Sequence, residues 1–129
     1  MTREEILALP AGPELDALVA EKVMGWEQRL SVEDDANDRW VYQTGTKPPY
    51  AVARLMDMWH PSTSIADAWL VVEKLGGNFC LNTPLQTSGW QCVIGGPHFA
   101  DVTASTAPHA ICLAALRAVE GTGEQESRP

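Results

Sequence analysis

The side chains of this 129-residue sequence that could do chemistry are aromatic rings, arginines, histidines and hydroxyls rather than paired nucleophiles and bases. Tryptophan rings near the ends of helices or strands can stack on a flat ligand. Hydroxyls at a helix start, beside the free N–H groups there, can hold an anion. The candidate ligand-binding residues are Arg39, Trp40, Arg54, Trp59, His60, Ser62, Thr63, Trp90 and His98. Packing of the rings in the core and ordinary helix capping by the hydroxyls stay open as alternatives.

Motifs for catalysis or metal binding are missing from the sequence. There is no Gly-x-Ser-x-Gly elbow, and the glycine-rich residues 95–98 lack the lysine of a phosphate-binding loop. No Cys-x-x-Cys or His-x-x-x-His pair pre-forms half of a metal site. His98 and Asp101 are the one acid/base couple of note, and a surface pair explains them as well. We therefore expect no enzyme activity, no catalytic residue, no metal and no cofactor.

Charge and cysteine content restrict the class of protein. The formal net charge of −8 argues against a protein that coats nucleic acid or an anionic membrane, because both need a basic field. Three cysteines without a close pair are typical of free thiols in a reducing compartment. The sequence has no signal-peptide pattern and no apolar run near the roughly 20 residues that span a bilayer. We expect a soluble, cytoplasmic protein with neither nucleic acid nor a membrane as its partner.

The clearest predicted element is a helix over residues 65–75, and we expect the rest of the chain to be organised around it. Hydroxyls at 62–64 can cap its start, and glycines at 76–77 can end it. Its buried face should contain Ile65, Trp69, Val72 and Leu75, which recur with helical spacing.

Other apolar patterns predict a helical turn at residues 6–9, a helix over 13–24 and a last helix between Thr106 and Gly121. Because Ser105 and Thr106 precede the last helix, its start is a second candidate anion site. Trp26 should lie in the core together with the tryptophan of the clearest helix.

Aromatic and β-branched residues predict strands at 39–43, 78–82, 90–94 and 99–104. Residues 51–58 are either another strand or an irregular loop, and the acidic residues 27–38 have the composition of an exposed connection. Strands joined by short hairpins pair antiparallel. The elements therefore predict a single α/β (α+β) domain over residues 1–120. It has a mainly antiparallel sheet with helices on both faces, or alternatively on one face, and a disordered tail at 121–129 follows it.

Several of these stretches carry a family resemblance. They are the N-terminal helix, Trp-His-Pro-Ser-Thr at residues 59–63 opening a helix that contains Ala68-Trp69, Gly89-Trp90 in a strand, and the final helix from Thr106 to Leu116. In this combination the chain resembles the phage ABA-sandwich domain family, small proteins of bacteriophages and prophages. The resemblance covers roughly residues 1–120. It implies a three-layer α/β/α sandwich and a homo-oligomer, and it carries over no functional residues.

Two functions are consistent with this resemblance and with the missing catalytic motifs. The first is a phage-encoded binding protein that sequesters a nucleotide-type immune signal of the host in a pocket between protomers. The second is a structural or accessory phage protein that acts only through protein interfaces. The first hypothesis rests on biological context and the spare aromatic residues rather than on a motif.

Overall fold

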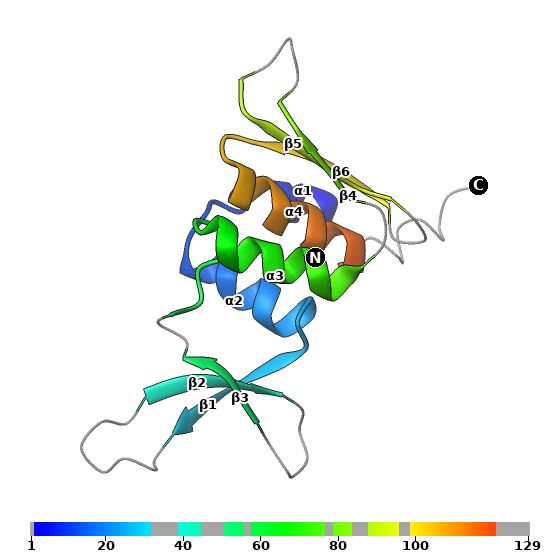
Figure 1. The fold of residues 1–129 in the computed structure, drawn as a ribbon. Helices are drawn as coiled ribbons and strands as arrows, with labels where there is room; N and C mark the ends of the chain where they lie inside the picture. The colour runs from blue at the N-terminus through cyan, green and yellow to red at the C-terminus, as the bar shows by residue number, and fades with distance from the viewer. Residues whose placement is uncertain are drawn as a thin grey trace.

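The computed structural model describes residues 2–31, 39–44, 51–55, 58–76, 79–83, 88–95 and 99–120. Along the chain, two helices are followed by three strands, a third helix, three more strands and a last helix (Figure 1). The helices are α1 (Arg3–Leu7), α2 (Pro13–Lys22), α3 (Ile65–Leu75) and α4 (Ala107–Glu120). The strands are β1 (Trp26–Ser31), β2 (Arg39–Thr44), β3 (Ala51–Leu55), β4 (Phe79–Asn82), β5 (Trp90–Ile94) and β6 (Ala100–Ala104). None of the helices in these ranges is long and apolar enough to cross a membrane.

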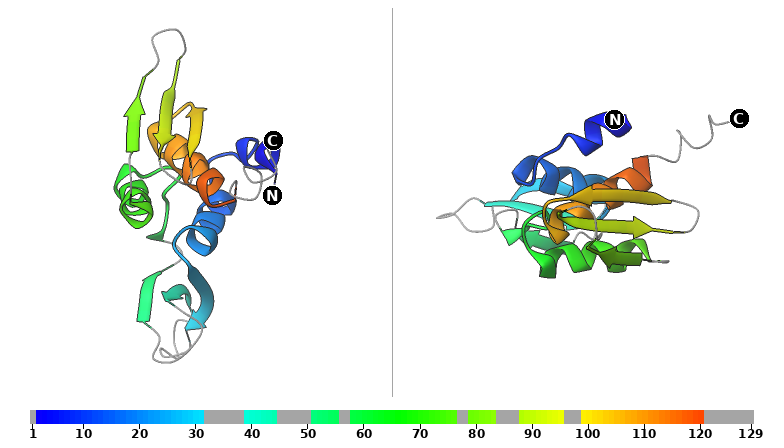
Figure 2. Two further views of the ribbon diagram at one scale, coloured as in Figure 1. Left: turned by 90° about the vertical axis from the view of Figure 1, so that its right-hand side faces the viewer. Right: turned by 90° about the horizontal axis from the view of Figure 1, so that it is seen from above.

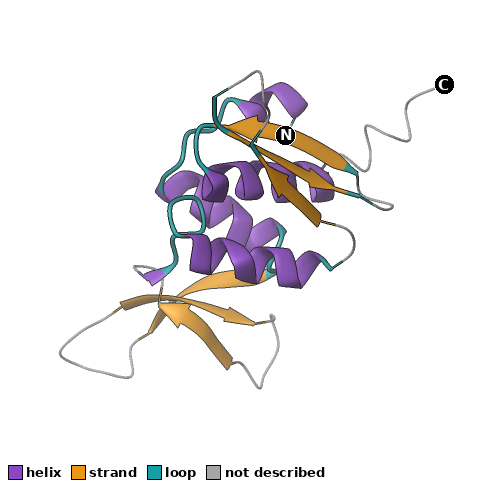
Figure 3. Ribbon diagram, turned by 45° about the horizontal axis from the view of Figure 1, so that its top comes forward, coloured by secondary structure: helices purple, strands orange, loops and turns teal. Residues whose placement is uncertain are grey.

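The strands form two antiparallel sheets, in the orders β1-β2-β3 and β4-β5-β6. The helices lie between the two sheets, with α4 against the β4–β6 sheet and α2 next to β1 (Figures 1, 2 and 3). The predicted mixed class and antiparallel pairing are confirmed. The expected three-layer order, with helices on both faces of one sheet, is not confirmed within one chain.

Helix α4 is the centre of the molecule. All nine residues at positions 110–118 are buried, and α4 packs against β5, β6 and the other three helices. A helix that is apolar on all sides must be covered on all sides. The sequence correctly predicts this helix but assigns the central place to α3. That assignment is wrong because α3 packs mainly against α4.

Helix α3 has the predicted bounds but buries a different face. Ser64 caps its start and Gly76, with φ of 64°, ends it. Ala68 and Val71 are fully buried, whereas Ile65 is 51% exposed and Trp69 is 50% exposed. The predicted buried face is therefore wrong for the two largest side chains. Small residues on the face toward α4 let the two helix axes approach closely, and larger ones would hold them apart.

The N-terminal half departs from the sequence prediction in two places. Helix α1 covers Arg3–Leu7, so it begins and ends earlier than the turn predicted at 6–9. Residues 27–31 belong to strand β1, so the exposed connection predicted at 27–38 is wrong over its first part. Their polar composition is not typical of a strand, so the sequence pattern does not predict one. The segment is a strand because it pairs with β2. Residues 51–55 are a strand, which decides between the two alternatives for that segment. Residues 32–38 and the predicted tail at 121–129 lie outside the described residues.

Candidate functional site

The candidate ligand-binding residues fall into three groups. Arg39 and Trp40 open β2, and Arg54 of β3 stands in register with Tyr42 of β2. Positions 59–63 form the segment that leads into α3. Trp90 begins β5 on the other side of the helices, and His98 lies outside the described residues. One chain therefore does not bring the two arginines and Trp90 together.

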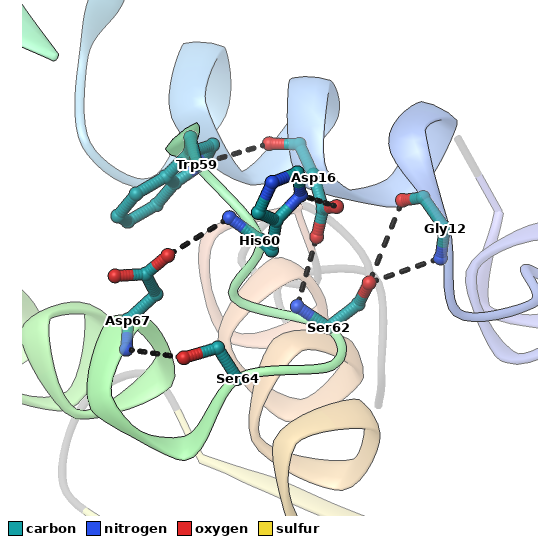
Figure 4. Close-up of polar contacts among 7 residues, drawn as sticks. All are labelled: Gly12, Asp16, Trp59, His60, Ser62, Ser64 and Asp67. Carbon is teal, nitrogen blue, oxygen red and sulfur yellow. Dashed lines mark hydrogen bonds and ion pairs between the residues drawn. The ribbon is translucent and has the colours of Figure 1, made fainter. Parts of the chain in front are cut away.

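The segment before α3 is fixed to the start of α2 by buried polar contacts (Figure 4). The backbone N–H of Ser62 donates to Oδ1 of Asp16 at 2.8 Å. The N–H of Gly12 donates to Oγ of Ser62 at 2.9 Å. Asp16 and Ser62 are both buried, and losing one partner of a buried hydrogen bond costs about 1–3 kcal/mol. Ser62 therefore takes part in an internal contact. The sequence predicts that its hydroxyl binds a ligand, but in the structure the hydroxyl is buried and not accessible.

Trp59 is a core residue. Its side chain is 1% exposed, its Nε1 donates to the backbone oxygen of Asp16 at 3.0 Å, and its ring meets the ring of Trp26 edge-on at 4.8 Å. The expectation that Trp59 offers a free aromatic face is wrong. Trp69, which was placed in the core, is the exposed one. The two tryptophans exchange roles because the segment before α3 folds back onto α2, which buries Trp59.

The start of α3 is also occupied by carboxylates. Oδ2 of Asp67 accepts the N–H of His60 at 2.9 Å, and Oγ of Ser64 accepts the N–H of Asp67 at 3.4 Å. Burial raises the pKa of Asp16, against the lowering effect of hydrogen bonds from Ser62. Two carboxyl groups beside the helix start repel a phosphate. The anion site expected from the hydroxyls at 62 and 63 is therefore not supported, although Thr63 itself is exposed.

A serine, a histidine and an aspartate meet in this segment without forming a catalytic group. Nδ1 of His60 lies 4.0 Å from Oδ2 of Asp16, and the His60 side chain is half exposed. Ser62, the nucleophile that such a group would need, has no exposed surface. The contacts among these residues serve to dock the segment rather than to activate a hydroxyl.

The start of α4 has the opposite character. Thr106 caps it, since its Oγ1 accepts the N–H of His109 at 3.4 Å, and the first turn contains no acidic residue. Ser105 and Thr106 are exposed. Nε2 of His109 lies 2.8 Å from the backbone oxygen of Leu9, which ties this end of α4 to the connection between α1 and α2. The positive end of the helix dipole thus faces outward without a carboxylate of its own first turn.

Trp90 stands beside this helix start. It pairs in register with Ala104 of β6, two residues before Thr106. Because side chains alternate along a strand, Trp90 lies on the same face of the sheet as the buried Cys92 and Ile94. Helix α4 covers this face. Trp90, at the end of the strand, is nevertheless 37% exposed. Gly89 has φ of 114°, and a Cβ there would lie 2.5 Å from the carbonyl oxygen of Ala104. Only glycine allows this close approach, which sets the place of Trp90.

The α4 start, defined as Trp90, Ser105, Thr106 and the first turn of α4, can hold a flat ring system that bears an anionic group. The ring would stack on the indole, and the anion would face the helix start. Sequence reasoning named Trp90 and the two hydroxyls separately. It missed that Trp90 pairs with Ala104, the residue before Ser105, because the β5–β6 register is a tertiary pairing.

Two of the three cysteines, Cys92 and Cys112, are buried, and Cys80 is exposed. Burial raises the pKa of Cys92 to about 12 and raises that of Cys112 well above its ordinary value, which makes both poor nucleophiles. Among the described residues, no three His, Cys, Asp or Glu side chains are grouped to hold a metal ion.

Comparison with known proteins adds a family and a structural relative. A sequence model of the phage ABA sandwich domain matches residues 17–116. The crystal structure of a phage protein from Bacillus cereus is similar to this chain, with a TM-score of 0.61 and 26% sequence identity. That match covers 87% of this chain and 94% of the other. No protein with a curated description matches the sequence.

Proposed function

This chain belongs to the phage ABA sandwich domain family, and from that premise we propose that it is a phage-encoded binding protein without catalytic activity. It acts in the host cytoplasm as a homo-oligomer and sequesters a nucleotide-type signal of host immunity. A phage benefits when such a signal is removed, and capture requires only affinity. The single observation that supports this proposal is the half-open indole of Trp90 beside the acid-free start of α4.

A nucleotide fits the two parts of the α4 start. Its base stacks on Trp90, an interaction worth about 1–3 kcal/mol per base. Its phosphate lies against the exposed Ser105 and Thr106 at the positive end of the helix dipole. Arg39 and Arg54 lie on the far side of the helices, so they reach the same ligand only from a second copy of the chain.

A second function is favoured by a different surface. Ile65 and Trp69, one turn apart on α3, are each about half exposed, and Trp69 meets Phe79 edge-on at 5.9 Å. An exposed patch that joins aliphatic and aromatic side chains is typical of a protein interface. This patch supports the alternative of a structural or accessory phage protein that acts only through protein partners.

The first test is to find the ligand. Protein purified from cells whose defence systems are signalling is denatured, and the released small molecules are identified by mass spectrometry. We expect a nucleotide in stoichiometric amount. Thermal unfolding with a panel of nucleotides should then give a Tm rise, because a ligand at 100 times its Kd stabilises a protein by about 2.7 kcal/mol.

Two pairs of variants locate the site. Thr106→Asp keeps an oxygen that can cap α4 but adds a negative charge, so the protein should stay folded and lose the nucleotide-dependent Tm rise. Thr106→Ser is the matched control and should keep both. Trp90→Ala should weaken binding on the order of tenfold or more, whereas Trp69→Ala removes an even more exposed indole elsewhere and should not.

A negative result has a defined meaning. A protein that releases no small molecule, forms a stable oligomer and shows no Tm rise with any nucleotide would contradict sequestration. It would favour the structural or accessory function. Equal loss of binding in Trp69→Ala and Trp90→Ala would place the ligand elsewhere.

A further inference from the structure

The four edge strands of the two sheets differ in charge. The edges are β1 and β3 in one sheet and β4 and β6 in the other. Strand β1 contains Glu27 and Arg29, β3 contains Arg54, and β6 contains Asp101. Strand β4 contains no charged residue. Charged residues on edge strands discourage pairing with other chains, so β4 is the one edge of the described sheets without this protection.

The chain on either side of β4 is uncharged as well, although Glu73 is exposed one turn after Trp69 on α3. No Asp, Glu, Lys or Arg occurs between Lys74 and Asp101 in a chain with a net charge of −8. Phe79 at the start of β4 packs against Trp69, and the half-exposed Ile65 lies one turn before Trp69 on the same side of α3. We call strand β4 together with Ile65 and Trp69 the β4 seam.

The negative net charge of the chain indicates how a second copy could pair with β4. Two copies of an acidic protein repel each other over most of their surface, and the repulsion is smallest where both present an uncharged strip. An edge strand needs a partner whose backbone donors and acceptors match its own, and the same strand of a second copy supplies them in antiparallel orientation. The outer face of the sheet is less suited to contact, because it presents exposed Asn82, Asp101 and Thr103.

We propose that two copies of the chain join through their β4 strands about a two-fold axis. This pairing turns two three-stranded sheets into one continuous sheet and covers Ile65 and Trp69 at the junction. The proposal rests on the homo-oligomer of the proposed function, but not on the nucleotide.

The two-fold axis restricts the register. An axis normal to the sheet keeps each residue on its own face, and residues directly opposite each other share a face. The pairing is therefore centred on one residue of β4, which for this four-residue strand puts Cys80 or Leu81 at the middle. Cys80 then lies opposite the second copy's Cys80 or opposite its Asn82. Both residues are exposed in the single chain.

Lysines in the seam should separate the copies. In Cys80→Lys/Asn82→Lys, either register places like charges opposite each other, so the dimer Kd should rise on the order of tenfold or more. The control Asp101→Asn/Thr103→Lys makes the same change in net charge on exposed positions of β6, the opposite edge of the same sheet. It should sediment as the wild type does. Circular dichroism confirms that both variants are folded.

Crosslinking identifies the register. Under mild oxidation by diamide, which takes up the two thiol hydrogens, wild-type protein forms a covalent dimer if Cys80 is central. Asn82→Cys forms one if Leu81 is central. The other two cysteines, Cys92 and Cys112, are fully buried and stay out of this reaction.

Three results would overturn the seam. They are a monomeric wild type in sedimentation at 100 µM or so, equal dissociation of both lysine variants, or no covalent dimer in either thiol experiment. A monomeric wild type would also contradict the homo-oligomer of the proposed function, whereas the Thr106 variants test nucleotide capture at the α4 start in the folded protein whatever its oligomeric state.

Discussion

The starts of α3 and α4 contain the same kinds of residue and differ in what those residues can do. Each has a hydroxyl cap and a tryptophan close by. At α3, Trp59 is buried, and the carboxyl groups of Asp16 and Asp67 accept the nearby N–H groups. At α4 the first turn has no acid, and Trp90 is partly exposed. The position of the carboxylates, rather than the hydroxyls, decides which start can accept an anion.

The difference arises from contacts between distant parts of the chain. Asp16 comes from α2 and closes the α3 start from outside the helix, while Trp59 fills the space against Trp26. The α4 start is instead approached by a strand end, where Gly89 brings the backbone close and leaves the indole of Trp90 at the rim. The α3 start therefore stabilises the fold, and the α4 start is the one that we propose for binding.

The largest expected difference between the two starts is in stability. Trp59→Ala should lower the free energy of unfolding by about 3–5 kcal/mol, because it removes a buried ring and its hydrogen bond to Asp16. Trp90→Ala should cost about 1 kcal/mol or less, since that ring is partly solvated already. Urea denaturation measures both values. Similar losses for the two variants would mean that the starts do not differ in the way described.

A smaller effect is expected from the glycine that positions Trp90. Gly89→Ala should destabilise the protein by about 2–3 kcal/mol, because its φ of 114° is strained for alanine and the added Cβ meets the carbonyl of Ala104. It should also weaken nucleotide binding by shifting Trp90. Gly25→Ala is the control: its φ of 74° also strains alanine, but a Cβ there has open space, so a smaller loss of about 1–2 kcal/mol is expected. Thermal unfolding measures the loss of stability in both variants. An equal loss in the control and in Gly89→Ala would contradict the steric argument.

The smallest effect is a pH dependence of opposite sign at the two starts. The folded-state pKa of Asp16 is raised above 3.8 by burial, so its protonated form favours the folded state. As pH falls through the raised pKa toward 3.8, wild-type protein should gain stability relative to Asp16→Asn, and it should lose that gain as pH rises again. A carboxylate introduced by Thr106→Asp should behave in reverse, because the helix dipole stabilises its charged form. Denaturation at a series of pH values measures both differences, and slopes of equal sign would count against the comparison.

The helices were largely readable from the sequence, and their burial was not. The cap at Ser64 and the stop at Gly76 are local signals, so the bounds of α3 are predicted correctly. Which face of α3 is buried depends on the small residues of its neighbour α4, which no local pattern contains. Trp69 is exposed for this reason, whereas Trp59 is buried because the segment before α3 folds back onto α2. Strand β1 was missed because its polar residues form a strand only when β2 pairs with them.

By itself, the sequence determined the mixed class, the family, the ends of α3 and the antiparallel hairpins of β4, β5 and β6, because caps, glycine turns and apolar spacing act over a few residues. The tertiary structure alone decided that the strands divide into two sheets and that α4 is central. It also decided that Ser62 connects the segment before α3 to the start of α2 and that Trp90 pairs with Ala104, two residues before Thr106. These features depend on contacts between residues far apart in the chain, whose burial and electrostatics exist only once the chain has folded.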